Sequence, residues 1–163
     1  MFAWLIQVCD RLVGNSTQFL AALRVGYSVS SPEIGELLNR VRQPFNVNSL
    51  ALAAAVAALE DDEHLARSVA VNEEGMQQLR AGFDAMGIGY IPSVGNFLCF
   101  QVPGNAGDAG RVYTDLLHEG VIVRPVGGYG LPGHLRVTAG LEDENTFFLQ
   151  ALAKVLAKVI GAR

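Results

Sequence analysis

Two arginines in the second half of the sequence stand where strand side chains could bind an anion. Arg124 lies in VIVRPV and Arg136 in HLRVTAG, separated by a glycine-rich stretch over 126–134. Strand alternation puts Arg136 on one face with His134 and Thr138. If the two strands pair as antiparallel neighbours, both guanidinium groups converge on one patch, where their N–H donors favour carboxylate or phosphate ligands. Spacing alone favours the plainer alternative of solvated arginines, or arginines paired with acidic side chains.

Other residue types that carry chemistry lack the spacing of a known site. His64, His118 and His134 do not have the spacing of metal ligands, so we interpret them as ordinary surface or helix-face histidines. The sequence contains no G-x-S-x-G motif, and its glycine-rich stretch matches neither GxGxxG nor a P-loop. Cys9 and Cys99 are far apart and have no CxxC partner, which favours buried thiols in a cytosolic protein.

The composition indicates a folded chain with one real core. Half of the 163 residues are hydrophobic, 17% are charged, and the mean hydropathy is +0.28, which excludes a disordered chain. The net charge is −4 and no basic block is present, so we expect no nucleic-acid partner. No run approaches the roughly 18 apolar residues of a membrane span, and Met1–Val8 lacks the basic region of a signal peptide. We therefore expect a cytoplasmic protein without a membrane partner.

Periodicity predicts helices and strands in a mixed order. We expect strands over 23–30, within 89–102, and over 121–125 and 135–138, and helices over 32–42, 46–59, 62–86, about 108–120, and from 142 onward. The stretch 88–163 is predicted to be a compact α/β unit. The helix over 46–59 is apolar almost all round, and a chain of this length has few elements to cover it. We expect it to expose an apolar face that a dimer or a higher homo-oligomer buries.

Several strings, taken together and in order, resemble one family. They are LAALRVGYSVS (20–30), RQPFNVNSLALAAAVAAL (42–59), YIPSVGNFL (90–98) and GVIVRPVGGYGLPGHLRVTAGLEDEN (120–145). These strings resemble the C-terminal part of the histidinol-phosphate aminotransferases, pyridoxal-phosphate enzymes of histidine biosynthesis with the aspartate-aminotransferase fold. The resemblance implies an α/β (α+β) fold. It implies the small C-terminal domain of that fold over 61–163, and a divergent N-terminus with a remnant of the large domain over 1–60.

The resemblance also implies roles for four residues. Arg24, in LRVGY, matches the arginine that holds the cofactor phosphate. Arg136 matches the arginine that binds the substrate α-carboxylate, and Arg124 matches one that helps to bind the substrate phosphate. Asn96, in GNF, matches a residue that lines the substrate end of the site. With these assignments, an anion-binding role for the two arginines becomes the favoured interpretation, although spacing alone favoured solvated or paired arginines. The resemblance also implies pyridoxal phosphate as the cofactor.

One position departs from the family pattern. The family has its Schiff-base lysine eight residues before the arginine matched by Arg24, and Ser16 stands there in this sequence. The only lysines of the chain are Lys154 and Lys158, late in the last predicted helix. Attachment of pyridoxal phosphate and movement of the α-proton need an amine, which serine lacks.

We therefore expect no covalent cofactor attachment and no transamination by this chain alone. Two other interpretations remain open. One is a module that holds a phosphorylated or carboxylated small molecule through Arg124 and Arg136. The other is a structural or oligomerisation module with no ligand.

Overall fold

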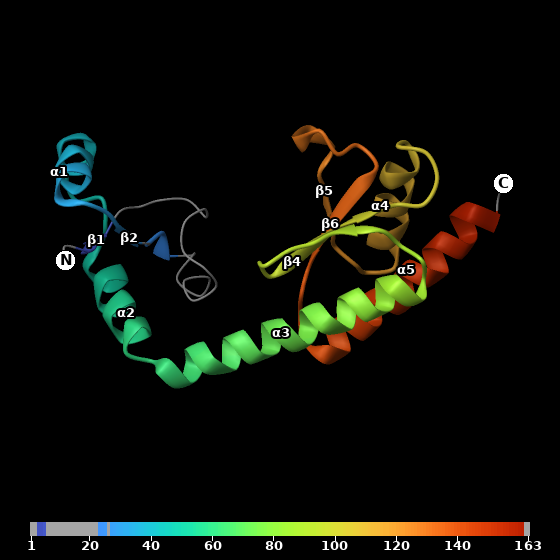
Figure 1. The fold of residues 1–163 in the computed structure, drawn as a ribbon, viewed down its shortest axis with the longest axis horizontal. Coiled ribbons are helices and arrows are strands. Elements are labelled where there is room, and N and C mark those ends of the chain that lie inside the picture. Colours follow the sequence, from blue (N-terminus) through green and yellow to red (C-terminus); the bar gives the residue numbers. More distant parts are fainter. Residues whose placement is uncertain (1–2, 6–22, 26, 162–163) are drawn as a thin grey trace. The chain divides into compact units, whose positions relative to one another are not determined.

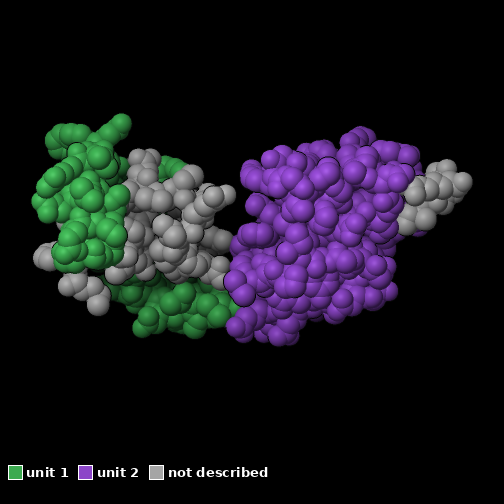
Figure 2. Space-filling view, turned by 45° about the horizontal axis from the view of Figure 1, so that its top comes forward, with its two compact units in different colours: residues 1–69 green, residues 70–163 purple. Residues whose placement is uncertain are grey.

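The computed structural model describes residues 3–5, 23–25 and 27–161, and the chain divides into two compact units (Figure 2). Unit 1 covers residues 1–69 and unit 2 covers residues 70–163. The helix α3 (Asp62–Ala85) begins in unit 1 and ends in unit 2. Over the described ranges, every helix is too short or too polar to cross a membrane.

Unit 1 contains a strand pair followed by two helices (Figure 1). The strand β1 (Ala3–Leu5) pairs antiparallel with β2 (Tyr27–Val29), and the helices α1 (Pro32–Val41) and α2 (Ser49–Leu59) come after them. The strand predicted over 23–30 is therefore shorter than expected. Arg24 has a φ of 54°, in the left-handed region, and an extended strand cannot contain that conformation.

The sequence just before each helix of unit 1 decides where the helix begins. Pro32 occupies the start of α1 as predicted, but the Ser31 hydroxyl does not cap the backbone. Instead, the backbone N–H of Glu33 and the side chain of Ser31 hydrogen-bond the Glu33 carboxyl and lower its pKa. Asn48 caps α2, because its side-chain oxygen accepts a hydrogen bond of 2.8 Å from the Ala51 N–H. For this reason α2 begins later than the predicted residue 46.

Unit 2 is an antiparallel sheet with helices on one face (Figure 1). Its four described strands lie in the order β3 (Tyr90–Ile91), β4 (Phe97–Gln101), β6 (His134–Thr138) and β5 (Arg124–Pro125). The helices are the second part of α3, α4 (Asp108–His118) and α5 (Glu142–Gly161). The long helix predicted over 62–86 is confirmed. The strand predicted over 121–125 is reduced to β5, its last two residues.

The core of unit 2 lies between one face of this sheet and the helices. Leu98 and Phe100 of β4 and Leu135 of β6 are fully buried, as the predicted alternation requires. Phe83 of α3 is also fully buried, with its ring centroid 5.0 Å from that of Phe100 and 6.1 Å from that of Phe148 in α5. These aromatic contacts join α3 and α5 to the sheet, so the opposite face of the sheet is the one left without helices.

Two glycines end the helices that hold this sheet. Gly87 has a φ of 66° two residues after the end of α3, and Gly120 has a φ of 81° two residues after the end of α4. A residue with a side chain adopts such angles only with strain, which is why glycine favours the end of a helix. Both helices therefore end close to the residues predicted from the sequence, 86 and about 120.

Candidate functional site

The sheet face of unit 2 that lacks helices brings two predicted site residues together. We call it the open face, and it carries Phe97, Cys99, Arg124, His134 and Arg136. The strands β5 and β6 pair antiparallel, with Arg124 directly opposite Arg136. Directly opposite residues of such a pair point to the same side of the sheet. The two guanidinium groups therefore start from neighbouring positions on the open face, as the sequence predicted for paired strands.

Arg136 is half-buried, and an aromatic ring supports it. Its guanidinium carbon lies 4.8 Å from the centroid of the Phe97 ring, a cation–π arrangement. Its Nε atom is buried and has no hydrogen-bond partner among the described residues. The same is true of Nδ1 of His134, two positions earlier on β6. Unpartnered buried polar atoms are costly, so a polar group placed against them would stabilise this part of the open face.

Arg124 is exposed and belongs to the edge strand. One of its terminal nitrogens donates a hydrogen bond of 3.4 Å to the Tyr129 hydroxyl, which comes from the short 3₁₀ helix Gly127–Tyr129 in the glycine-rich loop. In the described part of the chain, neither Arg124 nor Arg136 forms an ion pair within 4.0 Å; the ion pairs there are made by other basic side chains. Among the residues that the structure describes, neither arginine is therefore paired with an acidic side chain. Like charges in directly opposite positions destabilise a sheet, and an anion between them would remove that effect.

Cys99 of β4 lies directly opposite Arg136 of β6. Burial raises the pKa of the Cys99 thiol, and the nearby charge of Arg136 opposes this shift. The raised pKa means that Cys99 is a neutral thiol at neutral pH. It does not neutralise the guanidinium beside it, and the open face keeps its positive charge.

The other two predicted site residues have different positions. The Asn96 carbonyl accepts a hydrogen bond of 2.8 Å from the Ala139 N–H, which places Asn96 at the end of the β4–β6 pair. Arg24 belongs to unit 1, where it is exposed. Ser16, which stands at the lysine position, lies outside the described residues.

The two lysines of the chain lie on the helical side of unit 2. Lys154 of α5 contacts the Glu119 carboxylate at 2.6 Å, and Lys158 contacts the Asp115 carboxylate of α4 at 3.8 Å. Helices α4 and α5 share the core with the buried face of the sheet, so neither amine reaches the open face. Among the described residues, Arg124 and Arg136 therefore have no lysine amine beside them on the open face.

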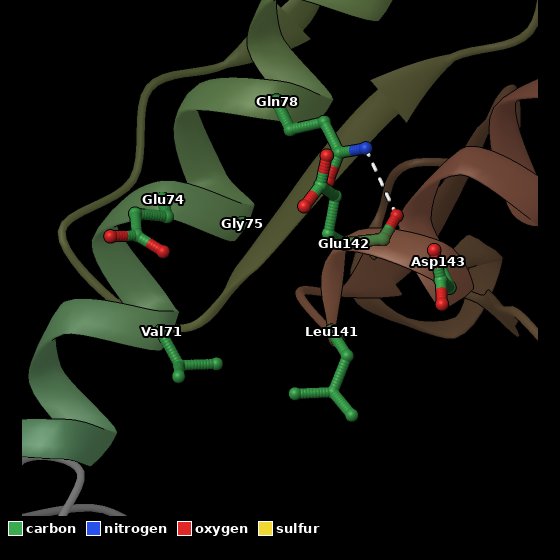
Figure 3. A pocket seen from close by; sticks show the side chains of 8 residues that line it. Val71, Glu74, Gly75, Gln78, Leu141, Glu142 and Asp143 are labelled. Carbon is green, nitrogen blue, oxygen red and sulfur yellow. Dashed lines mark hydrogen bonds between the residues drawn. The ribbon is translucent and has the colours of Figure 1, made fainter.

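Unit 2 also has a pocket that the sequence did not predict, between α3 and the start of α5 (Figure 3). A Cβ on Gly75 would lie 2.9 Å from the Gly140 carbonyl oxygen, so α3 and the segment after β6 approach closely. The buried Asn145 side chain accepts a hydrogen bond of 2.9 Å from the Gly140 N–H and donates one of 3.0 Å to its carbonyl. The pocket holds about 520 Å³ and is lined by Val71, Glu74, Gly75, Gln78, Gly140, Leu141, Glu142 and Asp143. With three carboxylates in its lining, it does not suit an anion.

Sequence reasoning missed Phe97 and Tyr129 as parts of the arginine site. Phe97 directly follows Asn96 in YIPSVGNFL, but its place beside Arg136 depends on the register between β4 and β6. Tyr129 lies in the glycine-rich loop, five residues after Arg124. The sequence carries no local signal that would have joined either residue to the arginines.

The comparisons with known proteins agree on one family. Residues 16–152 match the family model for aminotransferase class I and II. Histidinol-phosphate aminotransferase 2 of Pseudomonas fluorescens strain Pf0-1 is 63% identical over 139 residues, which are 85% of this chain and 37% of that protein. Histidinol-phosphate aminotransferase of Methylobacillus flagellatus is 52% identical over 158 residues, which are 95% of this chain and 42% of that protein. The chain thus spans about two fifths of the length of the curated relatives that it matches.

Solved structures show the same fold. The crystal structure of histidinol-phosphate aminotransferase from Sinorhizobium meliloti in complex with pyridoxal-5'-phosphate has 25% identity and a TM-score of 0.78. The match covers 86% of this chain and 38% of that one. The histidinol-phosphate aminotransferase from Clostridium acetobutylicum has 24% identity and a TM-score of 0.77, over 85% of this chain and 42% of that one. The predicted fold class is thereby confirmed, and the matched region is only a part of each larger chain.

Proposed function

Because this chain belongs to the aminotransferase class I and II family, we propose that its open face binds a small molecule through Arg124 and Arg136. The ligand carries a carboxylate or a phosphate group, since planar guanidinium groups hydrogen-bond both. One observation carries the proposal. Arg124 and Arg136 stand directly opposite each other in the register of β5 and β6, and no carboxylate of the described residues pairs with either.

Three neighbours prepare the two arginines for this role. The Phe97 ring holds the guanidinium of Arg136 and limits the freedom that it would lose on binding. The Tyr129 hydroxyl does the same for Arg124 more weakly, since that hydrogen bond is long at 3.4 Å. The neutral thiol of Cys99 leaves the positive charge available to the ligand. Together these contacts suit an anion held at two points.

The experiment that tests this binding is calorimetry with histidinol phosphate as the probe. Arg136→Gln is expected to weaken binding about tenfold or more, because a charge-assisted hydrogen bond contributes about 1.5–3 kcal/mol. Arg124→Gln is expected to act in the same direction. The matched control is Arg111→Gln, an exposed arginine of α4 on the helical side of the sheet. Equal binding heats from the wild type and Arg136→Gln would refute the proposal.

We further propose that the chain by itself does not transaminate histidinol phosphate. Family membership implies pyridoxal phosphate as the cofactor. Ser16 stands at the lysine position, however, and the two lysines pair with carboxylates near α4. Borohydride reduction in the presence of pyridoxal phosphate, followed by peptide mass spectrometry, is expected to find no stoichiometric adduct on Lys154 or Lys158. Such an adduct, or turnover above a boiled control, would contradict this part of the proposal.

A further inference from the structure

His134 stands on the open face beside the two arginines. Its spacing from the other histidines predicted an ordinary surface residue, but it is half-buried and begins β6. It lies two positions before Arg136, so the two side chains point to the same side of the sheet from Cα atoms about 7 Å apart. The loop that joins β5 to β6 ends at His134, and Tyr129 of this loop is the residue that Arg124 contacts at 3.4 Å. The two arginines and the histidine thus occupy neighbouring positions at one end of the β5–β6 pair.

Backbone hydrogen bonds fix the position of His134. Its own N–H donates a hydrogen bond of 3.1 Å to the Leu131 carbonyl, and the carbonyl of Gly133 accepts one of 2.9 Å from the Val102 N–H. Its direct neighbour on β4 is Gln101, which is exposed and carries no charge. No carboxylate of the described residues pairs with its ring within 4.0 Å. The imidazole is therefore held at a fixed point of the open face, with no acidic partner in the described part of the chain.

The two nitrogens of this imidazole have different surroundings. Nδ1 is buried and has no hydrogen-bond partner among the described residues. Nε2 also has no partner among them, but it is not buried, so a molecule on the open face reaches it. In a neutral imidazole one nitrogen carries the proton and the other is an acceptor. A buried N–H without an acceptor is costly, which favours the proton on Nε2 and makes Nε2–H the accessible donor.

We propose that His134 is a third contact of the anion site, and that its Nε2–H donates a hydrogen bond to the ligand that Arg124 and Arg136 bind. This role of His134 rests on the proposed anion binding and adds a residue to it. A neutral imidazole adds a donor without adding a third positive charge. It therefore strengthens the hold on an anion without increasing the repulsion between the two arginines.

The test compares variants of the full chain by calorimetry with histidinol phosphate, at about pH 8, where an ordinary histidine is neutral. His134→Phe keeps a ring but removes both nitrogens, and it is expected to weaken binding by about tenfold. His134→Gln keeps a side-chain N–H donor near the place of Nε2, and it is expected to recover most of that loss. The matched control is His118→Phe, at an exposed histidine of α4, which is expected to bind like the wild type.

Two further measurements separate a contact with the ligand from a purely structural role. His134→Phe removes a buried nitrogen that has no partner among the described residues, so urea unfolding without ligand is expected to show an equal or higher free energy of unfolding. NMR of the chain with isotope-labelled histidine is expected to find the proton on Nε2, and to show a shift of the Nε2 resonance when unlabelled histidinol phosphate binds. The His134 signals are those missing from the spectrum of His134→Gln.

Three results would show that His134 is not a ligand of the anion. The first is that His134→Phe binds like the wild type while Arg136→Gln binds more weakly, in which case the proposed anion binding stands without His134. The second is that His134→Gln binds no better than His134→Phe. The third is an Nε2 resonance that the ligand leaves unchanged. If the wild type does not bind histidinol phosphate, or Arg136→Gln binds it equally well, the proposed anion binding itself fails, and the role of His134 fails with it.

Discussion

We expect Arg124 and Arg136 to repel each other when no anion is bound, because they stand directly opposite each other on β5 and β6. Directly opposite residues of antiparallel strands have Cβ atoms about 4.5–5.5 Å apart. Two unit charges about 6 Å apart repel by about 0.7 kcal/mol in surroundings as polar as water. This agrees with the range of about 0.2–1 kcal/mol for cross-strand pairs. Because Arg124 is exposed, we expect Arg124→Gln to raise the free energy of unfolding by about 0.5 kcal/mol.

A bound anion is expected to make the wild type more stable than Arg124→Gln. At a ligand concentration ten times its Kd, binding stabilises the wild type by about 1.4 kcal/mol. If the variant binds tenfold more weakly, the same concentration stabilises it by only about 0.4 kcal/mol. The ligand thus favours the wild type by about 1 kcal/mol, which outweighs the repulsion of about 0.5 kcal/mol. The variant is the more stable protein without ligand, and the wild type is the more stable one with it.

The assay is urea unfolding followed by circular dichroism, at low salt, with and without histidinol phosphate. The wild type, Arg124→Gln and the control Arg111→Gln are measured side by side. Arg111 lies on α4, so its substitution is expected to leave both the basal stability and the ligand effect unchanged. The reasoning is refuted if Arg124→Gln is less stable than the wild type without ligand. It is equally refuted if histidinol phosphate stabilises the wild type and Arg124→Gln by the same amount.

Three further predictions concern unit 2. Phe83→Ala is expected to lower the free energy of unfolding by about 3–5 kcal/mol, against at most about 0.5 kcal/mol for the exposed Phe147→Ala, both measured by urea unfolding. Gly75→Ala is expected to destabilise the protein, because its Cβ would meet a backbone carbonyl oxygen at 2.9 Å. In the same assay Gly110→Ala, whose Cβ meets open space, is expected to stabilise it by up to about 1 kcal/mol. Burial raises the pKa of the Cys99 thiol, and the neighbouring Arg136 guanidinium opposes this shift only in part. The rate of Cys99 alkylation, followed by peptide mass spectrometry across a range of pH, is therefore expected to reach half of its maximum at a pH above the ordinary thiol pKa. A half-maximal rate at or below that pH would contradict the prediction.

Local patterns predicted most of the elements of unit 2. Glycines at the ends of α3 and α4 marked where those helices stop, because few other residues adopt a positive φ. Alternation along β6 separated the buried Leu135 from Arg136, since successive strand residues point to opposite faces. The predictions were less accurate where backbone conformation was decided by a single residue. Arg24 shortened the first predicted strand, and the Asn48 cap moved the start of α2.

The sequence by itself determined the family, the fold class and the two arginines as candidate ligands of an anion. Only the tertiary structure decided what surrounds them. The strand β4 lies beside β6, and this puts Phe97 and Cys99 next to Arg136. Strand order and register depend on pairing between segments more than thirty residues apart, and no local pattern encodes that pairing. The burial of a side chain likewise depends on contacts between distant segments. The helix α1 carries an apolar stripe with the pattern of a core helix, yet this stripe is exposed, because burial depends on what else packs against the helix.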